Sequence, residues 1–284
     1  MSASTEGTAT PVMIMVAPTG ASAQKKDNPA VPITPKEIAE EVIRCAAAGA
    51  SIAHIHARQP NGKPTQSIHV FREIIDRIRE KSDIVLQISL GTRGFTPEEA
   101  VEPVALRPEM VSLPLDAFQG DDAAAKEAVR HMAIHIRDHD VRPELSVYDD
   151  RMLSGALGLI HEGAIEAPAY FGLIIRDPGS VKEGATKIMA LADSLPSGSL
   201  WWVARGGRFG LALRSFAIGL GGHVRVGFED SVNDFDMSGL APSNAYLVER
   251  ITRLCSALGR GVASPAQARA VVRSGGRKML TPQA

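Results

Sequence analysis

Two histidines, His54 and His56, lie two residues apart where a short apolar run ends. Alternate side chains of a β-strand share a face, so a strand at this place would project both imidazoles the same way. Their Cα atoms would then be roughly 6.6 Å apart. Two imidazoles at that spacing can converge on one metal ion, since histidine is the commonest metal ligand. The pair could equally be polar residues packed at a strand end, so a metal site requires a third ligand.

Adjacent carboxylates at Glu229 and Asp230 follow another apolar segment, residues 223–228. Glu229 has the strand parity of Arg225, so both side chains would face the same side. Two histidines and one carboxylate with an open coordination position form a common catalytic Zn²⁺ arrangement. Fe²⁺ or Mn²⁺ could use the same ligands. The structural alternative is a helix-capping acidic pair with Arg225 as an ion-pair partner. Because the histidine pair is present, we favour the metal site.

Strand-like and helix-like segments alternate along the chain without a linker-like break. The expected strands are residues 12–16, 52–56, 84–89, 110–115, 144–148, 169–175, 200–204 and 223–228. The expected helices are residues 34–48, 67–80, a segment from 96, 122–138, 151–162, 181–195, 211–220, 244–258 and 265–274. Capping-box spacing at residues 34–37 and 96–99 supports two of these helix starts. Eight strand–helix units predict a single-domain (β/α)8 TIM barrel over residues 11–284, preceded by a disordered tail, residues 1–10. An open doubly wound sheet is the second possibility.

Polar residues alternate with apolar ones in several expected strands. In a barrel the helix-facing side should be apolar, so the polar sets should point into the lumen. Barrel enzymes place their chemistry at the C-terminal ends of the strands. The inward sets are His54, His56 and Arg58; Gln87 and Ser89; Glu144, Ser146 and Tyr148; and His223, Arg225 and Glu229.

The composition is that of an ordinary soluble protein, with 44% hydrophobic and 22% charged residues among 284. A net charge of −1 provides no electrostatic reason to expect nucleic acid or a membrane surface as a partner. The chain has neither a signal-peptide core nor an apolar stretch long enough to cross a bilayer, so a cytoplasmic protein is expected. Cys45 and Cys255 lie in helix-like patterns and are expected to be buried, reduced packing residues.

Five sequence blocks, spread in order over most of the chain, resemble the β-keto acid cleavage enzyme family. They are residues 17–21 (APTGA), 53–58 (AHIHAR), 87–91 (QISLG), 142–144 (RPE) and 221–230 (GGHVRVGFED). The resemblance implies a Zn²⁺-dependent barrel that converts a β-keto acid and acetyl-CoA into acetoacetate and a new acyl-CoA. It also implies a homo-oligomer, commonly a tetramer.

Carried over by position, the resemblance implies a role for each polar residue of the expected site. His54, His56 and Glu229 would bind the zinc ion. Asp230 would be the general base, with Arg225 as its charged partner. The substrate carboxylate would be held by Ser89 with the nearby backbone of Gly91. Arg205 and Arg208 flank a glycine-rich loop, residues 206–210, and could bind CoA phosphates; surface ion pairs and a tight turn explain these residues equally well.

The expected substrate pocket departs from the family pattern at two places. Family members that cleave an aminohexanoate have an acid where this chain has Ser22, followed here by Lys25 and Lys26. The substrate side chain is therefore expected to be neutral or anionic. The loop at residues 113–118 lacks the threonine that the family uses to hold the carboxylate. Glu144 matches an acidic family position and is a candidate substrate contact or a buried structural carboxylate.

Two other functions remain as alternatives. A metal-dependent hydrolase or an aldol-type lyase could use the same barrel, although a hydrolase would usually need further metal ligands from strands five to seven, where Glu144 is the inward candidate. A non-catalytic metal- or ligand-binding barrel would not need Asp230 or Arg225, and both are present.

Overall fold

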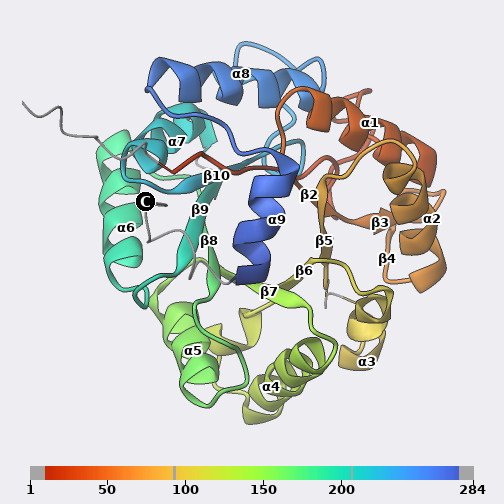
Figure 1. The fold of residues 1–284 in the computed structure, drawn as a ribbon, viewed down its shortest axis with the longest axis vertical. Coiled ribbons are helices and arrows are strands. Elements are labelled where there is room, and N and C mark those ends of the chain that lie inside the picture. Colours follow the sequence, from red (N-terminus) through yellow and green to blue (C-terminus); the bar gives the residue numbers. More distant parts are fainter. Residues whose placement is uncertain (1–9, 92–93, 206, 275–284) are drawn as a thin grey trace, which may run out of the picture.

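Eight parallel strands close into a barrel in the computed structural model, which describes residues 10–91, 94–205 and 207–274. The order around the barrel is β1-β10-β9-β8-β7-β6-β5-β2 (Figure 1). The strands are β1 (Ile14–Val16), β2 (Ile52–Ile55), β5 (Val85–Ser89), β6 (Met110–Leu113), β7 (Arg142–Val147), β8 (Tyr170–Ile175), β9 (Leu200–Arg205) and β10 (His223–Val226). The predicted single-domain (β/α)8 barrel is confirmed, and the open sheet is excluded.

Helices surround the barrel, as the alternating pattern predicts (Figure 1). They are α1 (Pro35–Ala47), α2 (Ile68–Arg79), α3 (Pro97–Val101), α4 (Ala123–Asp138), α5 (Asp150–His161), α6 (Val181–Asp193), α7 (Gly210–Gly219), α8 (Asn244–Ala257) and α9 (Pro265–Ser274), with 3₁₀ turns η1 (Glu102–Leu106), η2 (Asp116–Gln119) and η3 (Gly207–Phe209). Both predicted capping boxes form, at Thr34 and Thr96. Helix α3 is short because Pro103 has no backbone N–H to continue its hydrogen bonds.

A small antiparallel hairpin follows β2 and was not expected from the sequence. It consists of β3 (Ala57–Arg58) and β4 (Pro64–Thr65). The Arg58 side chain is buried here and donates hydrogen bonds to the carbonyl oxygens of Gly62, Gly20 and Ala23 at 2.7, 2.5 and 3.0 Å. These bonds tie the loop after β1 to the hairpin, so Arg58 supports one wall of the barrel mouth.

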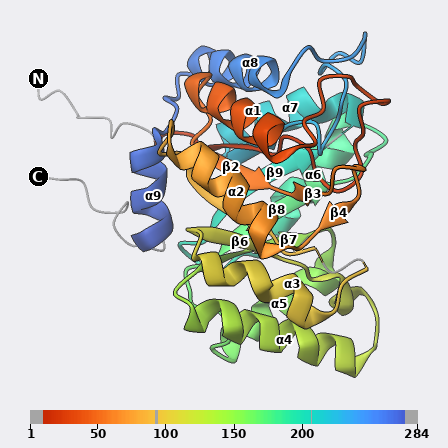
Figure 2. The same cartoon turned by 90° about the vertical axis from the view of Figure 1, so that its right-hand side faces the viewer.

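A cluster of buried apolar side chains fills the N-terminal end of the lumen. Helix α9 lies across that end of the barrel (Figures 1 and 2). Tyr170 of β8 donates a hydrogen bond from its hydroxyl to the Val271 carbonyl of α9 at 2.6 Å. The residues packed in this cluster include Met13, Met15, Ile52, Val85, Met110, Tyr170 and Trp202. Because the described residues fill and cover this end, the C-terminal ends of the strands are the expected entry for a ligand.

The two cysteines are buried and unpaired, as expected. Residues 1–9 of the predicted tail lie outside the described part of the chain. The remaining one, Thr10, accepts hydrogen bonds from Arg260 through its carbonyl oxygen. Within the described ranges, no helix combines the length and apolar character needed to span a membrane.

Candidate active site

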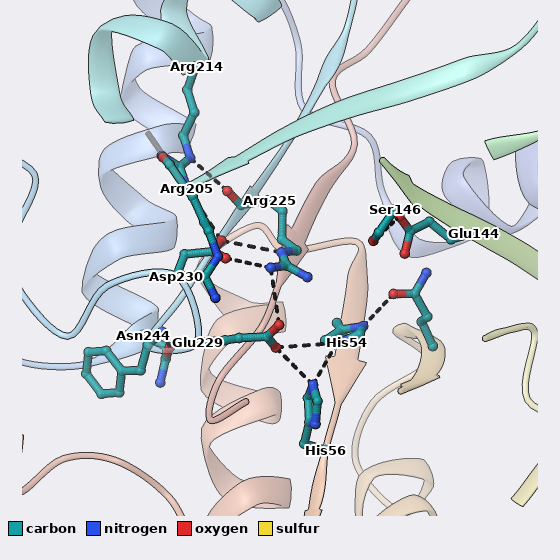
Figure 3. A network of polar contacts seen from close by, with 12 residues as sticks. His54, His56, Glu144, Ser146, Arg205, Arg214, Arg225, Glu229, Asp230 and Asn244 are labelled. Atoms are coloured by element: carbon teal, nitrogen blue, oxygen red, sulfur yellow. Dashed lines mark hydrogen bonds and ion pairs between the residues drawn. The ribbon is translucent and has the colours of Figure 1, made fainter. Parts of the chain in front are cut away.

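His54, His56 and Glu229 converge at the C-terminal mouth of the barrel (Figure 3). The two imidazole Nε2 atoms lie 3.1 Å apart, and Glu229 Oε2 lies 3.3 Å from each of them. The histidines come from the end of β2, and Glu229 follows β10, two strands away around the barrel. Among the described residues this is the one group of three or more His, Cys, Asp or Glu side chains that could hold a metal ion.

Two close backbone approaches place Glu229 at this point. After β10 the chain turns through Gly227, whose φ is +144°. The Glu229 N–H then donates to the Ala17 carbonyl oxygen at 3.1 Å, which joins it to the end of β1. Gly20, with a φ of +62°, lies directly against the Glu229 side chain, since a Cβ on Gly20 would be 2.5 Å from Glu229 Cγ. Glycine is therefore needed at both positions.

The protonation states of the cluster suit metal binding. Burial lowers the pKa of His54 to about 4, against the opposing effect of Glu229, so its imidazole is neutral at pH 7. Burial alone would raise the pKa of Glu229, but Arg225, His54 and His56 hold it well below its usual range. Metal ligands must be neutral imidazoles and ionised carboxylates, so these two side chains are in the binding-competent forms.

Hydrogen bonds orient His54 at both of its ring nitrogens, since its Nε2 also lies within hydrogen-bond distance of His56 Nε2. His54 Nδ1 lies 2.5 Å from Gln87 Oε1. When Nδ1–H donates to that oxygen, His54 Nε2 carries a lone pair, the arrangement in which a second residue orients a metal-binding histidine. Glu229 Oε2 is buried and, among the described residues, accepts no hydrogen bond of good geometry, although both imidazole Nε2 atoms lie 3.3 Å from it. The three donor atoms therefore fit a divalent ion such as Zn²⁺.

A guanidinium separates the two adjacent carboxylates. Arg225 Nη2 donates to Asp230 Oδ1 at 2.6 Å and lies 3.2 Å from Glu229 Oε1 (Figure 3). Burial opposes the charge of Arg225, but Asp230 and Glu229 together raise its pKa. Arg214 of α7 approaches Asp230 from the other side, with Nη2 3.6 Å from Oδ2. Asp230 is therefore a buried carboxylate held between two arginines.

A cavity of about 280 Å³ opens above the cluster. Its wall includes the two histidines and Glu229. Of the other residues predicted for the site, Ser22, Ser89, Gly91, Arg205 and Arg225 also line it. The proposed metal cluster and the proposed carboxylate-binding residues thus share one cavity, as the strand parity predicted.

Several other predicted residues do not line this cavity. Asp230 lies behind Arg225, and Glu144 lies behind Ser146, whose hydroxyl donates to Glu144 Oε1 at 2.8 Å. Arg208 lies in η3 with its guanidinium over the Phe209 ring. Lys25 and Lys26 are also absent from the wall, and Lys25 pairs with Glu37 at 2.9 Å. The charge of the cavity therefore does not come from these two lysines.

Other residues lie at the site although the sequence did not identify them as functional. Gln87 has the inward parity that should have marked it. Ser112 lies beside Ser89 in the strand register and lines the cavity, so it provides a hydroxyl near the place where the family threonine is missing. Gln66 is buried on the cavity wall, with an Oε1 that has no hydrogen-bond partner in the described structure. Arg214 comes from a helix, where strand parity provides no signal.

Glu144 is the carboxylate whose proton affinity depends most clearly on the fold. It is fully buried, and burial raises its pKa from 4.5 to about 7 despite the Ser146 hydrogen bond and Arg225. The folded protein thus binds a proton more tightly here than the unfolded chain does. The resulting stabilisation is complete below pH 4.5 and is lost as the pH rises through 7.

We therefore expect Glu144→Gln to become more stable relative to the wild type as the pH rises from about 4.5 to 7. The change should be on the order of 2–3 kcal/mol, because glutamine keeps the shape and an acceptor for Ser146 but has no charge to bury. Chemical denaturation of both metal-free proteins across this pH range measures the difference. A stability difference that does not vary with pH would contradict the expected burial of the charge.

Known proteins resemble this chain over nearly its whole length. The family described as beta-keto acid cleavage enzyme matches residues 11–273. The 3-keto-5-aminohexanoate cleavage enzyme of Fusobacterium nucleatum is 39% identical over 267 residues, which cover 92% of this chain and 97% of that one. The 3-oxoadipate:acetyl-CoA acetyltransferase of Cupriavidus necator is 31% identical, covering 92% and 94% of the two chains.

Solved structures support the fold independently. The apo structure of ObcA superimposes with a TM-score of 0.68 at 18% identity, covering 86% of this chain and 65% of that one. At that identity the likeness concerns the barrel alone. The family match and the sequence relatives go further: this chain is an enzyme and belongs to the beta-keto acid cleavage enzyme family.

Proposed function

We propose that the protein is a Zn²⁺-dependent transferase that converts a β-keto acid and acetyl-CoA into acetoacetate and a new acyl-CoA. The observation that carries this proposal is the triangle of His54, His56 and Glu229 donor atoms at the cavity. Within the described structure Glu229 Oε2 is buried there without a hydrogen bond, which is costly for an ionised oxygen unless a cation faces it. Family membership supports the reaction type.

The cavity offers one binding position for the ketone of the substrate and another for its carboxylate. When bound, the ion would polarise the substrate ketone and acidify the C2 protons. The Ser89 hydroxyl and the Gly91 backbone would hold the substrate carboxylate, and Ser112 lies close enough in the register to assist Ser89. Neutral His54 and ionised Glu229 would remain ligands throughout.

We propose that Asp230 is the base that removes the proton from C2. The Arg225 and Arg214 guanidiniums hold this carboxylate beside the cluster. Asp230 lies behind Arg225 and not on the cavity wall, so this role requires the Arg225 side chain to move when the substrate binds. Arg225 would then stabilise negative charge that develops on the substrate.

The bonds balance over two acyl-transfer steps. The C2 carbanion attacks the acetyl carbon of acetyl-CoA, a C–C bond forms, and the CoA thiolate leaves. The thiolate then attacks the original ketone carbon, and the bond between that carbon and C2 breaks. The acyl group leaves as acyl-CoA, and C2 recovers its proton from Asp230 to yield acetoacetate.

Two arginines at and after the end of β9 are the candidates for binding CoA. Arg205 lines the cavity at the end of β9 and would bind CoA phosphates. Arg208 lies three residues further along the chain, in η3, and would extend the same contact.

A homotetramer in the cytoplasm is the form that the family resemblance implies. Light scattering on the purified protein and fractionation of the source cells check these two points.

Incubation of the zinc-loaded protein with acetyl-CoA and a panel of cationic, neutral and anionic β-keto acids tests the reaction. Acetoacetate and the new acyl-CoA should appear in equal amounts, as measured by mass spectrometry, and neither should form without acetyl-CoA. Turnover of the keto acid without acetyl-CoA would indicate a hydrolase or lyase instead. No turnover with any acid would contradict the proposal.

A further inference from the structure

Arg176 lies on the cavity wall opposite the proposed metal site and has no ion pair among the described residues. From Arg176 we infer that the substrate is a β-keto dicarboxylic acid, with its second carboxylate bound by this guanidinium. The inference rests on the proposed function and specifies the substrate class. It depends on the position of Arg176, on its contacts and on the charges of the cavity.

The barrel order places Arg176 across the mouth from the histidines. In the closed ring of eight strands, β8 lies four strands from β2 in either direction, which is the opposite side. Arg176 immediately follows β8 and shares the face of Ile174, which also lines the cavity. A substrate bound at the metal cluster by its keto acid end would therefore extend its other end toward Arg176.

Arg176 is held in place by stacking and not by an ion pair. Its guanidinium lies over the Tyr148 ring, 4.0 Å from the ring centroid, and Tyr148 is itself part of the cavity wall. In the described part of the chain, no hydrogen bond or ion pair engages this guanidinium. Stacking uses the flat face of the group and leaves the N–H donors along its edge free. Those donors match the two oxygens of a carboxylate.

The charges that line the cavity favour an anion at this end. The acidic residues are Glu229 and Asp116, and the basic ones are Arg176, Arg205 and Arg225. Glu229 and Arg225 pair with each other at 3.2 Å. Among the described residues, the remaining lining charges are two arginines and the exposed Asp116 in η2, so this part of the wall has a net positive charge. Ser22 provides no carboxylate for a cationic substrate group.

The size of the cavity, and not burial, separates the expected ligands of Arg176 and Arg205, because both residues are exposed at neighbouring strand ends. CoA is far larger than the cavity of about 280 Å³, so its phosphates must stay outside, while a short diacid fits within it. Arg205 lies beside Ile175 at the next strand end and remains available for a CoA phosphate. The two arginines therefore have different expected ligands.

The test compares 3-oxoadipate with 3-oxohexanoate, which has the same carbon chain but lacks the second carboxylate. The wild type should prefer the diacid in kcat/KM by about 10- to 100-fold. Arg176→Gln should remove most of this preference, with turnover of 3-oxohexanoate unchanged within about threefold, and Arg176→Lys should restore part of it. The matched control is Arg253→Gln, an exposed arginine on α8 that should leave both activities as in the wild type.

Three outcomes would overturn the inference. One is a wild type that prefers the neutral or a cationic acid, in which case the proposed reaction still stands. Another is an equal loss with both acids in Arg176→Gln; if that loss disappears with acetyl-pantetheine, which has no phosphates, Arg176 binds CoA. The third applies if no acid reacts at all: calorimetry without acetyl-CoA then decides, and a diacid that binds the wild type no more tightly than it binds Arg176→Gln would contradict the inference.

Discussion

Glu229→Gln should lose bound zinc, whereas Asp230→Asn should keep the metal and lose turnover. Glutamine cannot supply the charged oxygen that faces His54 and His56 at 3.3 Å, so metal affinity should fall at least about 100-fold, and activity with it. Asparagine at position 230 leaves the three metal-binding side chains unchanged. It removes the proposed proton acceptor, which should cost about 10²- to 10⁴-fold in kcat.

Metal content after dialysis, together with kcat on the same samples, separates these two roles. A useful control is Glu249→Gln, because Glu249 is an exposed partner of Arg253 on α8, remote from the cavity. It should retain both metal and activity. Equal metal loss in Glu229→Gln and Asp230→Asn would show that the two carboxylates have been assigned wrongly. Full activity in Asp230→Asn would mean that another group is the general base. Glu144, which lies behind Ser146, would then be the next candidate.

Gly227→Ala should destabilise the protein by roughly 3 kcal/mol or more and displace Glu229 as well. The backbone at Gly227 has a φ of +144°, which side chains rarely allow, and an added Cβ would lie 2.2 Å from the Ala17 carbonyl oxygen. That oxygen accepts the Glu229 N–H. A clash there must move β1, β10 or the metal-binding carboxylate, and none of these is a flexible side-chain end.

Denaturation midpoints and zinc affinity measure the two effects of Gly227→Ala. Gly158→Ala is the matched control, since Gly158 lies in α5 with no atom within 4 Å of its added Cβ. Alanine there should be neutral or should stabilise the helix by about 1 kcal/mol. If both variants were equally stable and bound zinc equally well, the close packing of Gly227 against Ala17 would be disproved.

Local patterns in the sequence were sufficient to predict the barrel and the centre of its site. Strand period placed His54 and His56 on one face, and the same parity connected Glu229 to Arg225. Capping boxes marked the starts of α1 and α3. These features depend on residues a few positions apart, so they can be read without knowing the fold. The closure of eight such units then brings β10 and β2 to the two sides of β1, so that Glu229 and the two histidines lie close together.

Contacts between distant segments could not be read in this way. Arg214 reaches Asp230 from a helix, and Arg58 binds carbonyl oxygens of a loop 35 or more residues away. The sequence suggested that Lys25 and Lys26 set the charge of the pocket, but Lys25 pairs with Glu37 and neither lysine lines the cavity.

The sequence by itself thus determined the fold, the inward faces of the strands and the residue types of the His54, His56 and Glu229 cluster, because strand and helix periods are local. The tertiary structure decided which charges reach the cavity. It placed Asp230 behind Arg225 and set Arg176 across the mouth from His54, because those positions depend on strand order and on packing between elements far apart in the chain.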